Sequence, residues 1–473
     1  MKKLLKNGLV VTEKESVNVD ILIDGEKISK IAKNLPIIPD IQVIDVSGKW
    51  ILPGGVDAHV HLDLPMFDTV SSDDHYTGTK AAAFGGTTTV IDFISQDTDD
   101  LALNFNKLKE KAQSKAAVDF GFHANITHLT PEVEIQIPEL VNLGVTSVKV
   151  FTAYNHRLRL EDGEIFRVMR IARDAGILTM LHAENGDLIE LLVSEALAQR
   201  HTSPEWHART RPAWGSTEAV LRGSALAAVA DAPLYIVHMN VAGEVDQLEY
   251  ARSNGLKVMG ETCPQYLLFT DDRLADKDGA KWVCSPPLRK AVDQKRLWKG
   301  LKNHTIQTLA TDHCPFFFNG KKPIIYEDKP VAIPGKELGN GNFTKIPNGL
   351  PGVGDRMPVL FTEMVSKGQF TVNEFVRLTC TNPAKIFGIY PEKGTLEIGS
   401  DADIAVWDPH MNVDYGIKYS QQRTDYNLYE GFQLTGFPVM VFSRGDLIVE
   451  NGMWVGKQGR GKFISAKRFT TMI

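Results

Sequence analysis

Cysteine, long apolar runs and an excess of one charge are all scarce in this sequence. It has four cysteines in 473 residues, and no two of them are spaced as a CxxC pair. This excludes a disulfide scaffold and a structural zinc knuckle, and it favours a reducing, cytoplasmic compartment. No run of about 18 apolar residues occurs, so we expect no membrane span. The N-terminal segment lacks a cleavage-site pattern and is interpreted as a strand, not a signal peptide.

The charge balance gives no reason to expect nucleic acid or an anionic membrane as a partner. The formal net charge is −6 at pH 7, from 52 basic and 58 acidic side chains. Hydrophobic residues form 43% of the chain and charged residues 23%, which are the proportions of an ordinary globular protein. We therefore predict a globular protein whose partner is neither nucleic acid nor membrane.

The two ends of the sequence share a pattern typical of antiparallel strands. Apolar and polar residues alternate over residues 17–23, 27–31 and 41–46, and turn residues separate these stretches. Similar stretches occur at 402–407, 438–442 and 447–452. The pattern predicts one small, sandwich-like β domain built from residues 1–52 together with 390–455.

The middle of the sequence, residues 53–389, alternates short apolar strands with helical stretches. The predicted strands are Gly55–His61, Thr88–Phe93, Asp119–Ile126, Thr146–Phe151, Leu178–Ala183, Leu234–Met239, Lys257–Glu261 and Thr308–Asp312. Helical patterns lie between them, at 77–84, 101–114, 131–143, 164–175, 217–230, 243–253 and 290–302. This alternation predicts an α/β fold with a TIM-like (β/α)8 barrel. The alternative, an open doubly wound sheet, lacks the GxGxxG that would follow its first strand. The basic, glycine-rich tail at 456–473 is expected to be a solvated or subunit-contacting extension.

Four histidines, one lysine and one aspartate recur at the carboxyl ends of the predicted strands, where the active sites of such barrels lie. They are His59, His61, Lys149, His182, His238 and Asp312. His59 and His61 are two residues apart in a strand, so both rings point to one face and to one metal. The remaining histidines, except His313 beside Asp312, are interpreted as structural: His75, His123, His128, His156, His201, His207, His304 and His410.

Lys149 is unusual because it lies among apolar neighbours at the end of the fourth predicted strand. An ammonium group there would be costly to desolvate and would repel a nearby dication. Burial lowers the pKa of a lysine and exposes its neutral amine, which can add carbon dioxide to form a carbamate. The anionic carbamate would be able to bridge two metals. The alternative is a lysine that snorkels and pairs with an acidic side chain.

The candidate ligands offer nitrogen and oxygen donors and no thiolate. Such a set favours zinc, with manganese and nickel as alternatives. Six ligands are too many for one open catalytic zinc, but they suit two metals with an open bridging position. We therefore expect two divalent metal ions bridged by carboxylated Lys149.

Eight segments spread over nearly the whole chain have distinctive sequences. They are Asp57–Pro65 (DAHVHLDLP), Val148–Tyr154 (VKVFTAY), His182–Gly186 (HAENG), Gly260–Tyr266 (GETCPQY), Cys284–Arg289 (CSPPLR), Asp312–Cys314 (DHC), Lys345–Gly349 (KIPNG) and Gly399–Asp403 (GSDAD). Together they closely resemble the cyclic amidohydrolases, and most closely the hydantoinase/dihydropyrimidinase branch. The combination is highly specific, whereas the HxH pair alone would be weak.

The resemblance implies a role for each residue of the site. His59, His61 and Asp312 would hold one metal, His182 and His238 the other, and carboxylated Lys149 would bridge the two. Asp312 would be the general base that takes a proton from the bridging water and returns it to the leaving nitrogen. Tyr154 would hydrogen-bond the oxyanion. The backbone around Ser285 and Asn348 would recognise the cyclic –CO–NH– unit, with a plain turn role for Ser285 as the alternative.

The activity that the resemblance implies is hydrolysis of the ring amide of hydantoins or 5,6-dihydropyrimidines to N-carbamoyl amino acids. The partner would be a small cyclic amide, and the assembly a homotetramer or homodimer. Dihydroorotase would have an arginine two residues after the second histidine, where this chain has Asp63. Allantoinase has an acidic-Pro-Gly run after its HxH, where this chain has Leu64-Pro65-Met66. A non-catalytic, dihydropyrimidinase-like assembly protein would lack metal ligands that this chain retains.

Two stretches depart from the hydantoinase pattern. Residues 66–69 are Met-Phe-Asp-Thr instead of the common Phe-Gly-Gly-Thr, and residues 316–334 look like an insertion. Both are expected near the barrel mouth, where loops decide specificity. Leu64, Phe67, Phe151 and Leu158 are candidates for an apolar gate, with core or loop packing as the alternative.

Overall fold

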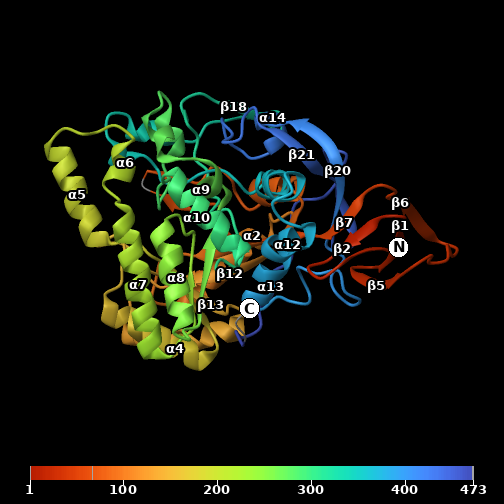
Figure 1. Cartoon of the computed structure of the whole chain (residues 1–473), viewed down its shortest axis with the longest axis horizontal. Helices are drawn as coiled ribbons and strands as arrows, with labels where there is room; N and C mark the ends of the chain where they lie inside the picture. The colour runs from red at the N-terminus through yellow and green to blue at the C-terminus, as the bar shows by residue number, and fades with distance from the viewer. Residues whose placement is uncertain (1, 67, 471–473) are drawn as a thin grey trace.

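The structure is a computed structural model that describes residues 2–66 and 68–470. Its centre is a parallel sheet of eight strands in the order β17-β16-β15-β14-β13-β12-β11-β8. Helices surround this centre, and the N-terminal strands lie to one side of it (Figure 1). The strands of the central sheet are β8 (Gly55–Val60), β11 (Thr87–Ile94), β12 (Asp119–Asn125), β13 (Ser147–Phe151), β14 (Leu178–His182), β15 (Leu234–Ile236), β16 (Val258–Thr262) and β17 (Thr308–Leu309). A parallel bridge between Val60 and His313 joins the end of β8 to the chain that follows β17. The sheet therefore closes into the predicted (β/α)8 barrel.

Helices follow the barrel strands, as the alternation predicts. The longer ones are α1 (Thr77–Phe84), α2 (Leu101–Gln113), α4 (Asp162–Ala175), α5 (Gly186–Ala198), α7 (Ala213–Ala230), α8 (Ala242–Ser253) and α10 (Ala291–Lys302). The helix predicted at 131–143 is divided into α3 (Pro131–Gln136) and a 3-10 helix at Pro138–Leu143. The division has a local cause, because Pro138 has no amide hydrogen and its ring crowds the preceding turn.

Short helices complete the fold: α6 (Trp206–Arg209), α9 (Pro264–Leu268), α11 (Arg356–Leu360), α12 (Val372–Val376), α13 (Asn382–Ile386) and α14 (Ile417–Ser420). Two small hairpins are β9 (Pro65–Met66) with β10 (Thr69–Val70), and β18 (Ile324–Tyr326) with β19 (Lys329–Val331). Over residues 2–66 and 68–470, none of the helices combines the length and the apolar content that crossing a bilayer would require.

Apolar side chains fill the interior of the barrel below the strand ends. The barrel strands contribute Val56, Ala58, Ile91, Phe93, Met180, Tyr235 and Met259 to this cluster, and Ile386, Phe387 and Ile464 join it from the later chain. Successive side chains of a strand point to opposite sides, so the strands that fill the interior also present inward residues at their carboxyl ends. The polar residues of the site therefore lie directly above a closely packed apolar layer.

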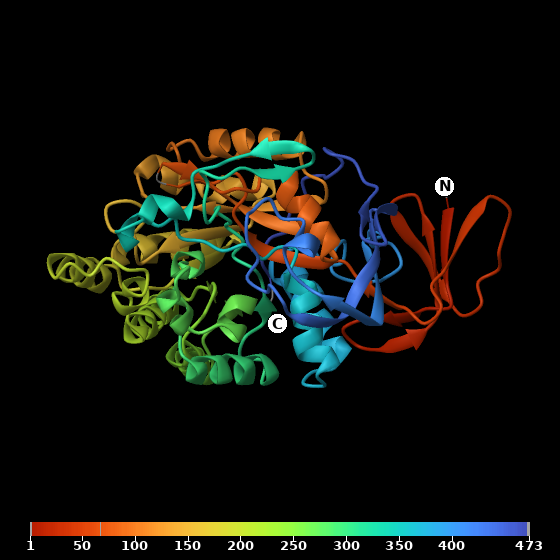
Figure 2. The same cartoon turned by 90° about the horizontal axis from the view of Figure 1, so that it is seen from above.

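Strands from both ends of the chain lie side by side next to the barrel (Figure 2). β7 (Trp50–Pro53) pairs antiparallel with β20 (Ile404–Asp414), which creates one seven-stranded sheet in the order β23-β22-β21-β20-β7-β2-β3. A four-stranded sheet, β5-β4-β1-β6, comes from the N-terminal part alone. The other strands are β1 (Lys2–Lys6), β2 (Leu9–Val11), β3 (Ser16–Asn18), β4 (Asp20–Asp24), β5 (Lys27–Ala32), β6 (Ile41–Asp45), β21 (Gln433–Ser443), β22 (Asp446–Glu450) and β23 (Met453–Trp454).

The described part of the C-terminal tail, residues 456–470, runs along the barrel. The amide of Phe120, in β12, donates to the carbonyl of Lys462 at 3.0 Å. Further along, the amide of Phe469 donates to the carbonyl of Gly176 at 2.8 Å, just before β14. The tail is therefore hydrogen-bonded at the amino ends of barrel strands, the end opposite to the one where the polar residues gather.

Glu244, in the first turn of α8, is a buried carboxyl group that titrates near neutral pH. Its Oε2 atom accepts hydrogen bonds from the amides of Asn240 and Val241 at 2.6 and 2.8 Å, but burial raises its pKa from 4.5 to about 7. Between these pH values the folded state keeps a proton that the unfolded state releases, so the free energy of unfolding falls as the pH rises. Glu244→Gln keeps an acceptor and cannot ionise. The difference in free energy of unfolding between the variant and the wild type is expected to change by about 1–3 kcal/mol in favour of the variant when the pH is raised from about 4.5 to about 8.

Urea unfolding of both proteins at the two pH values measures this gain. Glu249→Gln is the matched control, because Glu249 lies on the same helix. Partial burial raises the pKa of Glu249, but hydrogen bonds from Arg296 and Thr305 outweigh it and lower the pKa. We expect no such gain for the control. Parallel stability curves for the wild type and Glu244→Gln would contradict the prediction.

Candidate metal centre and active site

A cavity of about 400 Å3 opens at the carboxyl ends of the barrel strands. Eight of the nine residues predicted for the site line it: His61, Lys149, Tyr154, His182, His238, Ser285, Asp312 and Asn348. The ninth, His59, is fully buried, and its Nε2 atom lies 3.0 Å from Nζ of Lys149. The fold thus gathers all nine residues around one cavity.

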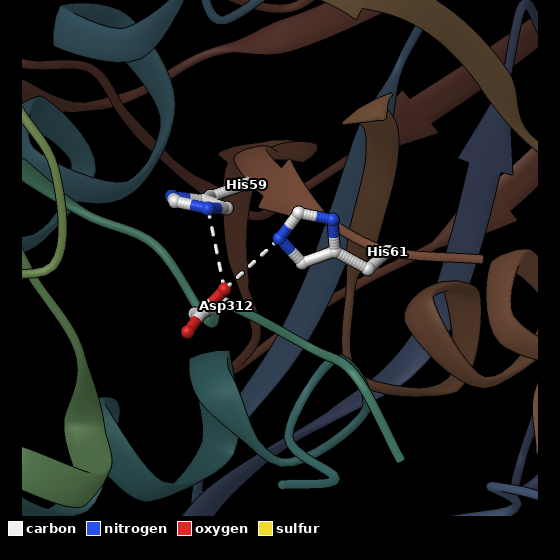
Figure 3. A group of neighbouring side chains, drawn as sticks. All are labelled: His59, His61 and Asp312. Atoms are coloured by element: carbon white, nitrogen blue, oxygen red, sulfur yellow. Dashed lines mark ion pairs between the residues drawn. The ribbon is translucent and has the colours of Figure 1, made fainter. Parts of the chain in front are cut away.

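His59, His61 and Asp312 form one group of donor atoms (Figure 3). The Nε2 atoms of both imidazoles lie 3.2 Å from the same carboxylate oxygen, Oδ1 of Asp312. One donor atom from each residue lies within 4.8 Å of the other two. His59 belongs to β8, His61 follows that strand, and Asp312 follows β17, the strand at the other edge of the closed sheet. Three such donors facing one point are arranged as ligands of a metal ion would be.

Lys149, in β13, is buried against this group. Its Nζ atom lies 3.0 Å from Nε2 of His59 and 4.3 Å from the centre of the Phe93 ring. The ion pairs found over the described residues include none between Lys149 and a carboxylate, so the alternative of a lysine paired with an acid does not describe this side chain. Burial lowers the pKa of the Lys149 amine to about 8, which makes the neutral amine accessible near neutral pH.

His182 and His238 form a second pair of imidazoles. His182 ends β14, and His238 comes two residues after β15. Nδ1 of His182 lies 3.0 Å from Nε2 of His238, and the ring centres of His238 and His59 are 5.4 Å apart. The second pair is therefore adjacent to the first group, as the ligands of two neighbouring metals would be.

Two buried glutamates hold these histidines in place, and the sequence analysis assigned a role to neither. Oε1 of Glu261 lies 2.7 Å from Nδ1 of His59, and Oε2 of Glu184 lies 2.9 Å from Nε2 of His182. A carboxylate on one ring nitrogen fixes the ring and leaves the other nitrogen available to a metal. Their positions in the sequence could have indicated this role, because Glu261 ends a predicted strand and Glu184 is two residues after His182.

The residues present fit divalent metal ions that prefer nitrogen and oxygen ligands. Each of His59 and His182 has one ring nitrogen on a carboxylate and the other facing the cluster. Cys314 also lines the cavity, but burial raises the pKa of its thiol well above the usual value, so it offers no thiolate. Imidazole and carboxylate donors without thiolate agree with the donor set expected from the sequence.

Asp312 is an ionised carboxylate held by the chain beside it. Thr311 donates to the buried carboxylate of Asp57 through its amide at 3.1 Å and its hydroxyl at 2.7 Å, which ties the end of β17 to β8. Burial favours the neutral acid, but the neighbouring histidines and Lys149 lower the pKa of Asp312 to about 2. The group is therefore able to accept a proton at neutral pH.

Three residues of the site have left-handed backbone conformations. The φ angles are +67° for Tyr154, +40° for His238 and +53° for Asp312. Residues other than glycine adopt this region at a cost of about 1–3 kcal/mol, and such residues cluster at functional sites where the surrounding structure enforces the conformation. The sequence carries no local signal for this feature.

Tyr154 and Ser285 face the cavity from different segments. The ring centre of Tyr154 is 5.1 Å from that of His182, and burial raises the pKa of Tyr154 above its usual value, so its hydroxyl keeps its proton and can donate it to an acceptor. Oγ of Ser285 lies 3.3 Å from Nε2 of His207, which also bonds the carbonyl of Cys284 at 2.8 Å. His207, interpreted from sequence as structural, thus supports the Ser285 segment.

His313, next to Asp312, takes part in the wall of the barrel and not in the metal group. Its Nε2 atom lies 3.1 Å from the carboxylate of Asp73, and its Nδ1 atom accepts from the amide of Gly352 at 3.0 Å. Both ring nitrogens are therefore occupied by structural partners.

The residues proposed as an apolar gate are only partly described. Leu64, Phe151 and Leu158 line the cavity, whereas Phe67 lies outside the described residues. The insertion at 316–334 contains the hairpin β18–β19, and Glu327 at its turn pairs with the buried Lys80 of α1 at 2.5 Å. The cavity lining contains no residue of this insertion.

The chain belongs to the Amidohydrolase family, whose model matches residues 50–452. A D-hydantoinase from Geobacillus stearothermophilus is 42% identical over 100% of this chain and 98% of its own. A D-hydantoinase from Streptomyces coelicolor is 41% identical over 98% of this chain and 97% of its own. The crystal structure of dihydropyrimidinase from Brevibacillus agri NCHU1002 has a TM-score of 0.95 and 44% identity, and the match covers 100% of both chains. The family resemblance predicted from the motifs is confirmed, and the allantoinase alternative is not favoured.

Proposed function

We propose that this hydrolase opens the ring amide of hydantoins and 5,6-dihydropyrimidines and releases N-carbamoyl amino acids. The observation that carries the proposal is the convergence of four imidazoles, Lys149 and Asp312 at one cavity. The names of full-length relatives, D-hydantoinase and dihydropyrimidinase, support a small cyclic amide as the substrate. The apolar residues that line the cavity beside these polar groups suit a ring with an apolar substituent.

The proposed cofactor is a pair of divalent metal ions, with zinc favoured by the donor set. His59, His61 and Asp312 would hold one ion, His182 and His238 the other, and Lys149, carboxylated on Nζ, would bridge them. Bound metal ions of this kind lower the pKa of water and polarise a carbonyl group. The buried amine of Lys149, 3.0 Å from His59 and in no ion pair with a carboxylate over the described residues, supports the carbamate, because that modification converts a repelling cation into an anionic ligand.

Other groups of the cavity would carry out proton transfer, oxyanion stabilisation and binding of the ring. Asp312, ionised at neutral pH, would take the proton of the attacking water and pass it to the leaving ring nitrogen. Tyr154, whose hydroxyl keeps its proton, would donate a hydrogen bond to the developing oxyanion. The backbone around Ser285 and Asn348 would bind the –CO–NH– unit and orient the ring for attack.

The proposal extends to the compartment and the assembly. All four cysteines are buried and free of disulfides, which supports a reducing cytoplasm. The resemblance to hydantoinases supports a homotetramer or homodimer, which light scattering of the purified protein would measure.

A comparison of three substrate classes tests the proposed reaction. We expect kcat/KM for a hydantoin with an apolar 5-substituent or for dihydrouracil to exceed that for allantoin by at least about tenfold, because the polar ureido group of allantoin would be desolvated in a partly apolar cavity. Metal content is measured in the same preparation. Removal of metal by a chelator should abolish the activity, and zinc should restore it. Activity on allantoin alone, or full metal content without activity on any of the three, would contradict the proposal.

A further inference from the structure

Lys336 is a fully buried lysine that the proposed mechanism does not use. It begins a short 3-10 helix at Lys336–Gly339, after the hairpin β18–β19. Its exposed fraction is 0%, and its amide is bonded to the carbonyl of Phe317 at 2.7 Å. A lysine side chain placed this far from water requires specific polar partners.

Three backbone carbonyls surround the ammonium group of Lys336. Nζ donates to the carbonyls of Val283 at 2.7 Å, Pro347 at 3.0 Å and Gly349 at 2.7 Å. An ammonium has three donors and no acceptor, so these three bonds use its full capacity. No carboxylate pairs with Lys336 over the described residues, and the carbonyl oxygens alone compensate the charge.

The three carbonyls belong to the two segments that present Ser285 and Asn348 to the cavity. Val283 is two residues before Ser285, and Pro347 and Gly349 are the two neighbours of Asn348. The two segments also touch directly, because the amide of Gly349 donates to the carbonyl of Val283 at 3.1 Å. Lys336 therefore joins, through one atom, the two backbones that flank the proposed ring-binding groups.

The second segment is linked in turn to the catalytic carboxylate. The amide of Cys314, two residues after Asp312, donates to the carbonyl of Leu350 at 3.0 Å. This bond holds the end of the segment beyond Asn348 to the chain that carries Asp312. Small displacements of the peptide groups around Asn348 would lengthen or misalign the hydrogen bonds that hold the –CO–NH– unit, and so weaken them.

We propose that Lys336 is a positioning residue whose ammonium holds the 283–285 and 347–349 backbones at the spacing that recognises the substrate ring. This inference rests on the proposed function, because the ring-binding role of the two segments comes from it. Lys336 does not touch the substrate and acts through the carbonyls that it binds. Interactions of this kind act equally on the bound substrate and on the transition state, so their loss raises KM and leaves kcat nearly unchanged.

Lys80 provides a matched comparison within the same part of the fold. It is also buried, at 7% exposed, and it holds the hairpin β18–β19 through Glu327 at 2.5 Å. Its side chain contacts Tyr76, Tyr326 and Glu327, and none of these three residues lines the cavity. Loss of Lys80 thus loosens the insertion without touching the ring-binding segments.

The test compares Lys336→Met, Lys336→Gln and Lys80→Met with the wild type in the metal-loaded enzyme, using dihydrouracil and a 5-substituted hydantoin. We expect KM to rise roughly tenfold to hundredfold in both Lys336 variants, with kcat within about threefold and metal content unchanged. Lys336→Gln retains donors and should show the smaller rise. Lys80→Met should keep the wild-type KM.

Several outcomes would overturn the role of Lys336. An unchanged KM in a folded, metal-loaded Lys336 variant would do so, and so would a loss confined to kcat. Failure of both Lys336 variants to fold, while Lys80→Met folds, would make Lys336 a folding determinant and not a positioning residue. An inactive wild-type enzyme would instead refute the proposed function, so the two failures are distinguishable.

Discussion

Replacing Lys149 with alanine is expected to remove bound metal and to lower kcat by at least about a thousandfold. The reason lies in the position of Nζ, 3.0 Å from Nε2 of His59 and at the same cavity as His182 and His238. An anionic bridge at this position would be the one ligand shared by both metals, and alanine offers no donor. Metal analysis and the rate on a 5-substituted hydantoin measure the effect. A 13C signal of a carbamate carbon, obtained with labelled bicarbonate, should be present in the wild type and absent from the variant.

Two controls separate loss of the bridge from loss of the fold. Lys80→Met removes another buried lysine, one outside the cavity, and should keep metal and rate. Acetate or propionate added to Lys149→Ala places a carboxylate in the vacated space and should restore part of the metal content. Full metal content and full rate in Lys149→Ala without such an additive would refute the bridge.

Asp312→Asn is expected to lower kcat by roughly 10²- to 10⁴-fold, which is the usual contribution of a general base. The asparagine amide has the shape of the carboxylate and retains one oxygen atom that can bind a metal, but it cannot accept the proton of the attacking water. Because Asp312 is also a proposed ligand, the rates are measured in excess zinc with the bound metal determined in parallel. KM should change far less than kcat, since substrate binding is assigned to other segments.

Asp97→Asn is the matched control for Asp312→Asn. Asp97 lines the same cavity, but no ion pair joins it to the site histidines among the described residues. This variant should keep most of the wild-type kcat. A fully metallated Asp312→Asn enzyme with the wild-type kcat would remove Asp312 from the role of base.

The barrel and the polar residues at its strand ends were predictable because both follow from patterns of neighbouring residues in the sequence. A buried parallel strand is a short apolar run, and the residue that ends it lies at the same edge as the ends of all the other strands. This is why His59, Lys149, His182 and Asp312 could be placed together before any distance was known. The position of α1 at Thr77–Phe84 was also predicted to the residue.

Long-range pairing could not be predicted in the same way, because the partner of a group is chosen by the folded chain. Nothing near Glu261 in the sequence indicates that its carboxylate meets the ring of His59, 2.7 Å away. The alternating pattern predicted one β domain from both chain ends, but it did not indicate which strands pair, such as β7 with β20.

Residue types and their spacing thus specify the fold class, the family and the residues of the candidate metal site. The tertiary structure alone decides how the site is held. It bends Tyr154, His238 and Asp312 into left-handed conformations, and it directs the ammonium of Lys336 to three carbonyls of distant segments. The physical reason is that a buried charge or a strained backbone is stable only when many packed neighbours enforce it together, and those neighbours meet only in the folded protein.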